Sequence, residues 1–135
     1  MEKQIWQTIR SKLNDFFIQR IETSIERGIP DVHYCVDGVS GWLEGKYLQS
    51  PKRENTKLKL KLSIEQMAWH KSYKHNGGLV YLIVKKDKQI YLFDSNDGED
   101  LAKGVTRDDW EKKALAKDWN TIRIFLSKKE KNNIK

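Results

Sequence analysis

Two acidic residues and a lysine between Gly28 and Lys46 form the strongest chemical pattern in the sequence. Asp31 precedes one short apolar run, and Glu44 stands two residues before Lys46 in the next run. Carboxylate oxygens of this kind are the ligands that Mg²⁺ and Mn²⁺ prefer. Such a cation polarises a phosphodiester and lowers the pKa of an attacking water, and a lysine can stabilise the developing charge. The same residues also fit a surface hairpin with scattered charges.

A β-hairpin is the element that must bring these side chains together. Two short apolar runs flank the dipeptide Asp37-Gly38, and Asp-Gly between such runs is a strong hairpin pattern. Side chains alternate along a strand, so Trp42, Glu44 and Lys46 share one face of the second strand. We expect the hairpin to place Asp31 beside that face.

The stretch resembles the PD-(D/E)XK nuclease superfamily. Pro30-Asp31 matches the first half of the motif, and Glu44-Gly45-Lys46 matches the second half. The chain is most similar to small phage-type members related to VRR-NUC domains and Holliday junction resolvases. The similarity reaches from near the N-terminus to about Asp94 and includes Arg20-Ile21-Glu22, 28–32, 41–44, Gln66 with Trp69, and Gly77-Gly78. One departure is Gly45, since the family usually has an apolar residue there and glycine can mark a strand bulge.

The resemblance implies a metal-dependent DNA endonuclease that leaves a 5′-phosphate. It implies that Asp31 and Glu44 hold Mg²⁺, with Mn²⁺ as a chemical substitute, and that Lys46 positions or activates the attacking water. A glutamine on the helix after the motif helps to place water or phosphate in this family, and Gln66 matches it. Ser63 to Gln66 is also a capping-box pattern, so Gln66 has a structural interpretation as well.

An additional carboxylate often lies upstream of the motif in this superfamily, near the metal. Glu22 is the first candidate for this metal ligand because it belongs to the matched segment Arg20-Ile21-Glu22. Glu2 is the second candidate, although an acid at the start of a helix also suits the helix dipole. Arg20 can bind phosphate, since a guanidinium group makes bidentate contacts with oxyanions.

The charge balance favours a polyanionic partner. The chain of 135 residues carries a net charge of +7, and nucleic acid is the partner that such a charge best fits. Between Lys46 and Lys61, six basic residues accompany one acid, Glu54. A solvated edge strand protected by lysines is the alternative interpretation of this segment. The predicted DNA-binding residues are Arg20, Lys52, Arg53, Lys57, Lys59 and Lys61.

Several classes of protein are disfavoured by composition. Cys35 is the sole cysteine, so no internal disulfide can form, and no paired base supports a nucleophilic role. No apolar run approaches the ~18 residues that a membrane span needs, and no signal peptide is recognised. We therefore expect a cytoplasmic protein that does not enter a membrane, located in the host-cell cytoplasm if a phage encodes it.

The pattern of elements predicts one α/β domain over residues 1–135, with a central mixed sheet of about five strands flanked by helices, as in restriction endonucleases. The predicted helices are 1–14, 63–75 and 106–117. The predicted strands are 32–36, the run from Trp42, 79–84, 89–93 and 121–126, with an alternating segment at 57–62. Residues 16–22 fit either a continuation of the first helix or a first strand, and the resemblance implies the strand. Residues 23–28 are expected as a loop, 94–98 as a polar turn and 127–135 as a mobile basic tail.

Branched DNA, such as a Holliday junction, is the expected substrate on the resemblance. One chain carries one site and symmetric junction cleavage needs two, so we expect a homodimer. Two alternatives remain open: a noncatalytic nucleic-acid-binding module on a nuclease fold, and a sequence-specific nicking or restriction-type endonuclease. The sequence has no feature that reads a 2′-hydroxyl, so it does not distinguish DNA from RNA.

Overall fold

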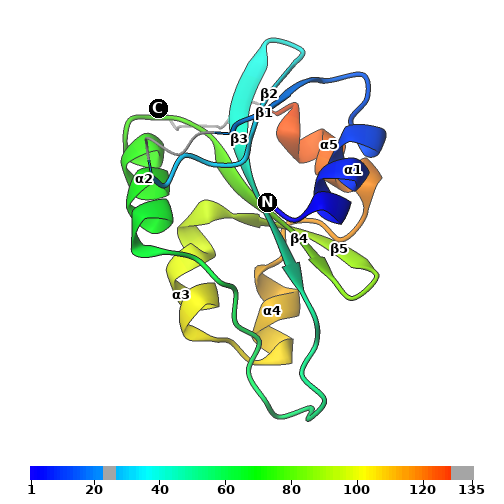
Figure 1. Cartoon of the computed structure of the whole chain (residues 1–135), viewed down its shortest axis with the longest axis vertical. Coiled ribbons are helices and arrows are strands. Elements are labelled where there is room, and N and C mark those ends of the chain that lie inside the picture. Colours follow the sequence, from blue (N-terminus) through cyan, green and yellow to red (C-terminus); the bar gives the residue numbers. More distant parts are fainter. Residues whose placement is uncertain (23–26, 129–135) are drawn as a thin grey trace.

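Figure 1 shows a central sheet with helices on both of its faces. The structure is a computed structural model that describes residues 1–22 and 27–128. The strands of the described residues are β1 (Phe17–Arg20), β2 (Val32–Val36), β3 (Val39–Leu48), β4 (Val80–Lys86) and β5 (Gln89–Asp94). The helices are α1 (Lys3–Lys12), α2 (Ile64–His75), the 3-10 turn η1 (Ser95–Asp97), α3 (Gly98–Lys103), α4 (Arg107–Lys113) and α5 (Trp119–Leu126).

The five strands lie in the order β1-β2-β3-β4-β5. β3 and β4 run parallel, and the other neighbouring pairs run antiparallel. A parallel pair needs a crossover connection, and residues 49–63 with α2 supply it. The predicted α/β fold with a mixed sheet of about five strands is confirmed.

The hairpin of β2 and β3 forms at the predicted turn. Asp37 and Gly38 have φ angles of 51° and 77°, the left-handed conformation that a type I′ hairpin turn requires at both central positions. The antiparallel register runs from this turn to the pair of Val32 and Leu43. Asp31, the residue before β2, therefore falls opposite the residue that follows Leu43.

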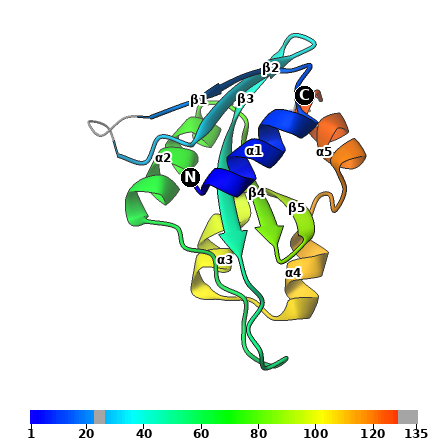
Figure 2. The same cartoon turned by 45° about the vertical axis from the view of Figure 1, so that its right-hand side comes forward.

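Apolar side chains form one core cluster on each face of the sheet. Figure 2 shows α1 and α5 together on one side of the strands, with α3 and α4 nearer the opposite end. Ile5 of α1 packs in the same cluster as Ile83 of β4. The neighbouring Leu82 and Val84 pack in the other cluster, with Trp110 of α4. β4 is thus buried on both faces, as its continuous apolar run predicts.

The alternating lysine and leucine segment lies beside the second core cluster. Leu58 and Leu60 are buried, and the lysines between and beside them are exposed. The segment is extended but belongs to no sheet strand, because its pairing is a single bridge between Leu58 and Val105. The predicted alternation is confirmed.

The predicted final strand at 121–126 is wrong, because this segment belongs to helix α5. Asp118 caps that helix, and its side chain accepts a hydrogen bond from Thr121 N at 2.8 Å. Ile122 and Leu126 are buried four residues apart, while Ile124 between them is 59% exposed. The alternation of Ile122, Ile124 and Leu126 matches a strand, but the four-residue spacing of Ile122 and Leu126 also matches one face of a helix.

Two other boundaries also differ from expectation. Residues 94–98, expected as a polar turn, form the last residue of β5, the whole of η1 and the first residue of α3. Helix α4 ends at Lys113 rather than near Lys117, because the following residues return to β5. There Leu92 N donates to Ala116 O at 2.9 Å. The chain therefore leaves the helix to make a short β contact.

Two expected segments fall partly outside the described residues: 23–26 of the loop and 129–135 of the basic tail. Across residues 1–22 and 27–128, no helix is both long enough and apolar enough to cross a membrane.

Candidate active site

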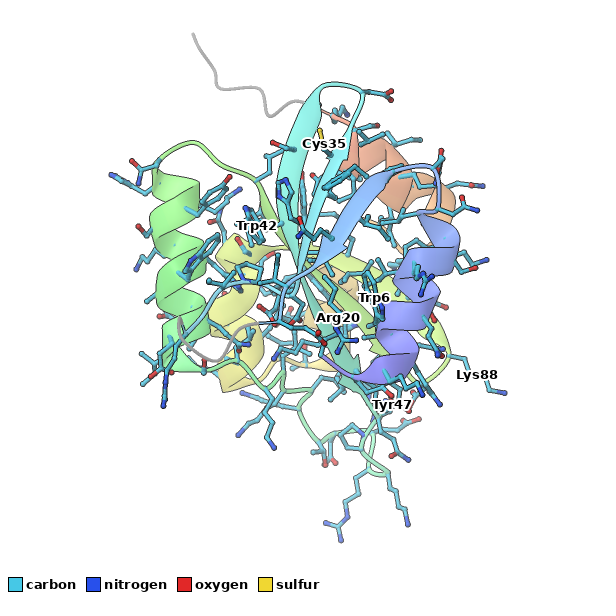
Figure 3. The ribbon with its side chains drawn as sticks, turned by 45° about the horizontal axis from the view of Figure 1, so that its top comes forward. Trp6, Arg20, Cys35, Trp42, Tyr47 and Lys88 are labelled. Carbon is cyan, nitrogen blue, oxygen red and sulfur yellow. The ribbon has the colours of Figure 1, made fainter. Side chains whose placement is uncertain are left out.

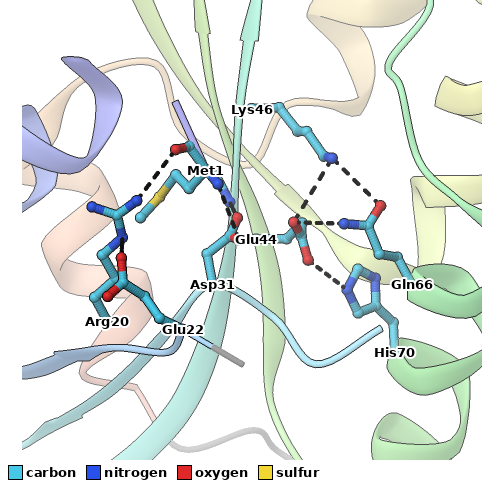
Figure 4. A network of polar contacts seen from close by, with 9 residues as sticks. Met1, Arg20, Glu22, Asp31, Glu44, Lys46, Gln66 and His70 are labelled. Carbon is cyan, nitrogen blue, oxygen red and sulfur yellow. Dashed lines mark hydrogen bonds and ion pairs between the residues drawn. The ribbon is translucent and has the colours of Figure 1, made fainter. Parts of the chain in front are cut away.

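Glu44 lies in a buried polar network on the face of β3 that is directed towards α2 (Figure 4). Its side chain is 1% exposed. Gln66 Nε2 donates a hydrogen bond to Glu44 Oε2 at 3.1 Å, and Lys46 Nζ lies 3.8 Å from the same oxygen. Lys46 Nζ also donates to Gln66 Oε1 at 3.4 Å. β3 and α2 thus bring three of the predicted site residues into direct contact.

Gln66 has both of the roles expected from its sequence context: it caps helix α2, and it contacts Glu44 and Lys46. Its backbone N–H donates to Ser63 Oγ at 3.0 Å, and its Oε1 accepts from Ser63 N at 3.0 Å, which is a complete capping box. The same side chain reaches Glu44 and Lys46 through its other contacts. The cap therefore fixes the rotamer that presents the amide nitrogen to Glu44.

Asp31 is tied to the backbone of β3 between the other two motif residues. Its Oδ2 accepts a hydrogen bond from Gly45 N at 2.9 Å, and its side chain is 18% exposed. The Met1 amino group lies 3.9 Å from Asp31 Oδ1. Asp31 is thus the more accessible carboxylate of the pair, and Glu44 is the more deeply buried one.

Burial, together with the neighbouring carboxylate of Asp31, changes the protonation of Glu44. Burial raises the pKa of Glu44 to about 9, and the negative charge of Asp31 adds to that rise. The charge of Lys46 acts in the opposite direction but does not offset the burial. Without a further positive charge, the Glu44 carboxyl therefore keeps its proton at neutral pH.

Gly45 does not interrupt β3. The parallel register is continuous from Trp42 opposite Val80 to Leu48 opposite Lys86, with Gly45 opposite Ile83. An added Cβ at Gly45 would come within 2.7 Å of Met1 Sδ. The residue is therefore small because α1 and Met1 pack against this side of β3, and the expected alternation of Glu44 and Lys46 is retained.

His70 is a neighbour of the site that the sequence reasoning missed. It lies one turn after Gln66 on α2, and its Nε2 is 3.4 Å from Glu44 Oε1. Its side chain is 3% exposed. Burial lowers the pKa of His70 to about 4, and the nearby Lys46 lowers it further. The imidazole is therefore neutral at pH 7, and the contact with Glu44 is a hydrogen bond rather than an ion pair.

An open cleft of about 630 Å³ adjoins the carboxylates. Asp31, Arg20, Glu22 and Arg27 line it together with Gln66. Arg20 Nε lies 3.5 Å from Glu22 Oε1, and the Glu22 side chain is 75% exposed. Glu22 is thus at the cleft but not in the buried network, and Arg27 is a second arginine there that the sequence analysis did not select.

Glu2, the second candidate for the additional metal ligand, is the N-cap residue of α1. Its Oε1 accepts a hydrogen bond from Ile5 N at 2.9 Å, so it caps α1. The structure does not bring it into the network around Glu44. Its proposed role as a metal ligand gains no support from these contacts.

The basic loop after β3 is fixed at its base and exposed at its tip. Arg107 donates hydrogen bonds to the carbonyl oxygens of Pro51, Arg53 and Glu54 at 2.8 to 3.2 Å. These bonds hold the loop against α4 without using its own basic side chains. The predicted DNA-binding residues of the loop and the following segment are all exposed: Lys52, Arg53, Lys57, Lys59 and Lys61.

The oxygen donors of the site fit a divalent cation. Within 1–22 and 27–128, no group of three His, Cys, Asp or Glu side chains could hold a metal ion. Mg²⁺ does not require such a group, because it keeps several waters and binds through one or two carboxylates plus substrate phosphates. A buried carboxyl beside a second carboxylate, with its pKa raised, is stabilised in its charged form by an added cation. Asp31 and Glu44 supply that arrangement.

Comparisons with known proteins identify the fold. A scan against protein-family models and a search of curated proteins both found no match. Among solved structures, the chain is similar to Hjc, a Holliday junction resolvase from the archaeal hyperthermophile Archaeoglobus fulgidus. The TM-score is 0.52 at 15% sequence identity, and the match covers 70% of this chain and 78% of the resolvase. The chain therefore has an α/β fold like that of a resolvase nuclease.

Proposed function

We propose that the protein is a divalent-metal-dependent DNA endonuclease of the PD-(D/E)XK type. The observation that carries this proposal is the buried Glu44 beside Asp31, with Lys46 and Gln66 in contact with it. A buried carboxyl with a pKa near 9 is costly to ionise, and structural stability alone gives no reason to retain it. The resolvase-like fold supports the same assignment.

Asp31 and Glu44 would hold Mg²⁺ or Mn²⁺, and Glu22, which lines the same cleft, would be the additional carboxylate. When bound, the cation supplies Lewis-acid polarisation of the phosphodiester and activation of the nucleophilic water. Lys46 presents its ammonium group 3.8 Å from Glu44 and stabilises negative charge that develops on the phosphate. Gln66 holds Glu44 in its rotamer through the 3.1 Å hydrogen bond.

The surface around the cleft would bind the DNA backbone. Arg20 lines the cleft beside Asp31, and the loop after Lys46 continues the positive charge with exposed lysine and arginine side chains. Contacts of this kind to phosphates set affinity and orientation rather than sequence preference.

We propose branched DNA as the substrate and a homodimer as the active form. The similarity to a Holliday junction resolvase supports the first statement. The second follows from the first, because symmetric cleavage of a four-way junction needs two sites and the chain offers one.

The test is cleavage of a labelled four-way junction beside a linear duplex of equal length, with Mg²⁺, Mn²⁺ or EDTA. Wild type, Glu44→Ala and the control Glu99→Ala would be compared, since Glu99 is 71% exposed on α3. We expect metal-dependent junction cleavage that Glu44→Ala alone loses. Equal cleavage of the duplex would refute the preference for branched DNA. Binding without cleavage under every condition would instead favour a noncatalytic binding module.

A further inference from the structure

A row of aromatic rings crosses the strands β1 to β3 and ends on α2. The ring centroids of Phe17 and His33 are 6.2 Å apart, and those of His33 and Trp42 are 4.9 Å apart. Trp42 meets Trp69 of α2 edge-on at 5.4 Å, and Trp69 stacks on Tyr73 at 5.0 Å with an interplanar angle of 13°. Figure 3 shows Trp42 on the side of the hairpin that is directed towards α2.

This aromatic row does not contribute to the main hydrophobic cores. Within the described residues, the two core clusters do not include Phe17, Trp42, Trp69 or Tyr73, either as buried members or as packed neighbours. Phe17 is 57% exposed, and Gln19 and Ser40 on the same face of the hairpin strands are also exposed. On the opposite face, Val32 and Tyr34 are buried in the cluster formed with α1 and α5. The row therefore lies on the wetter face of this part of the sheet.

The aromatic row is continuous with the candidate active site. Trp42 and Glu44 are two residues apart on the same face of β3, which corresponds to roughly 7 Å along a strand. On α2, Trp69 precedes His70, which contacts Glu44. A DNA strand whose phosphate lies in the cleft at Asp31, the accessible carboxylate beside Glu44, would therefore bring its neighbouring nucleotides towards these rings.

Nucleobases are the chemical group that suits such a surface. Aromatic side chains beside a positively charged groove are a common platform for unpaired bases, because every base has a π-face and stacks without sequence preference. The chain carries a net charge of +7, and Arg20 and Arg27 line the cleft next to the carboxylates. Bases within an intact duplex are already stacked on each other and cannot use these rings.

We propose that Phe17, Trp42 and Trp69 stack unpaired bases of the DNA strand next to the scissile phosphate. The proposal rests on the proposed nuclease function for the identity of that phosphate. It narrows the substrate class to DNA with unpaired nucleotides near the cut, such as a flap, a splayed arm or an opened branch point. A fully paired linear duplex lacks the group that the row recognises.

The test is binding in EDTA of fluorescently labelled oligo-thymidylate and of a blunt duplex, followed by anisotropy. Phe17→Ala and Trp69→Ala remove one ring each, and Trp69→Phe restores an aromatic face. Ile124→Ala is the matched control, because Ile124 is a 59% exposed apolar residue on α5. Phe17→Ala should fold normally, since the exposed ring lies outside both core clusters, so a loss of binding in this variant cannot be attributed to misfolding.

We expect each alanine variant to bind the single strand about 10-fold more weakly than wild type. Trp69→Phe should recover most of that affinity, and Ile124→Ala should bind like wild type. Duplex affinity should stay the same for all variants. Wild-type affinity of both alanine variants for the single strand would overturn the proposal, as would an equal loss on both DNAs.

This readout is separate from catalysis, because EDTA removes the cation that cleavage needs. If wild type fails to cut any DNA in Mg²⁺ but the stacking variants still lose single-strand binding, the nuclease proposal fails and the stacking site stands. If cleavage is metal-dependent but the variants bind single strands normally, the stacking proposal alone fails.

Discussion

The two faces of β3 bury side chains of opposite character. Leu43 and Gly45 are directed towards α1, where Leu43 is fully buried among apolar side chains. Glu44 and Lys46 are directed towards α2, where Glu44 is equally buried but surrounded by polar groups. The same strand thus buries a leucine on one face and a carboxyl group on the other.

This difference separates residues kept for stability from residues kept for chemistry. Burial of Leu43 removes apolar surface from water and stabilises the fold. Burial of Glu44 raises its pKa to about 9, so ionisation of Glu44 opposes folding at neutral pH. A sequence selected for stability alone would not place an acid there, which is why the second face is the candidate site.

Glu44→Gln has the largest expected effect on function and an opposite effect on stability. We expect cleavage to fall about 1000-fold, as for loss of a group that stabilises transition-state charge. We expect the free energy of unfolding in EDTA to rise by about 1 kcal/mol, because the amide, unlike Glu44, does not have to take up a proton when the protein folds at neutral pH. Single-turnover cleavage and denaturant unfolding measure the two quantities. A loss of stability with normal cleavage would reverse the assignment of this face.

Leu43→Ala tests the other face of the strand. The substitution should lower the free energy of unfolding by about 3 kcal/mol, because it leaves a cavity in the core beneath α1. Cleavage per folded molecule should change little, since the side chain points away from Glu44. Urea unfolding and cleavage at saturating Mg²⁺ would show this, and a large loss of activity in fully folded protein would contradict the separation of the two faces.

The pH dependence follows from the raised pKa of Glu44. The folded protein raises the pKa of Glu44 to about 9 from its ordinary value of 4.5, so the contribution of this group to stability falls as pH rises between these two values. Metal binding needs the ionised carboxylate. Mg²⁺ affinity should therefore rise about tenfold per pH unit below 9, measured by calorimetry. Glu44→Gln should bind weakly with no such slope.

His70 is expected to have a smaller effect, as a positioning residue for Glu44. His70→Ala should weaken Mg²⁺ binding about tenfold, because loss of an outer-shell partner typically has an effect of this size. His70→Asn keeps a donor at a similar place and should restore part of the affinity. If His70→Asn binds Mg²⁺ no more tightly than His70→Ala when the two variants have equal thermal stability, the imidazole acts through packing alone.

The parts of the fold that rest on local chemistry were predictable from sequence. Asp37-Gly38 determines the hairpin through its backbone conformation, and Ser63 with Gln66 determines the start of α2. Helix α5 was predicted as a strand because its apolar residues also alternate. Asp118, which caps the helix, is a local helix-start signal that the prediction did not use, and the burial of Ile122 and Leu126 on one helical face came only from the tertiary structure.

The site was partly predictable for a similar reason. Asp31, Glu44 and Lys46 follow from a motif on two paired strands, so sequence spacing places them. His70 has no motif of its own, but it lies four residues after Gln66 and hence on the same helical face. That spacing could have identified it. Glu2 matched the expected chemistry, yet its side chain caps α1, and the sequence alone did not decide between these uses.

The most direct test of the contrast between the two faces is thermal unfolding of wild type and Glu44→Gln during titration with Mg²⁺ near pH 8. A ligand that binds only the folded state raises the melting temperature increasingly as its concentration exceeds its dissociation constant. We expect Mg²⁺ to stabilise wild type progressively and to leave Glu44→Gln almost unchanged, although Glu44→Gln is the more stable protein in EDTA. Equal stabilisation of both proteins would show that the cation binds elsewhere and would contradict the assignment of Asp31 and Glu44 as the metal site.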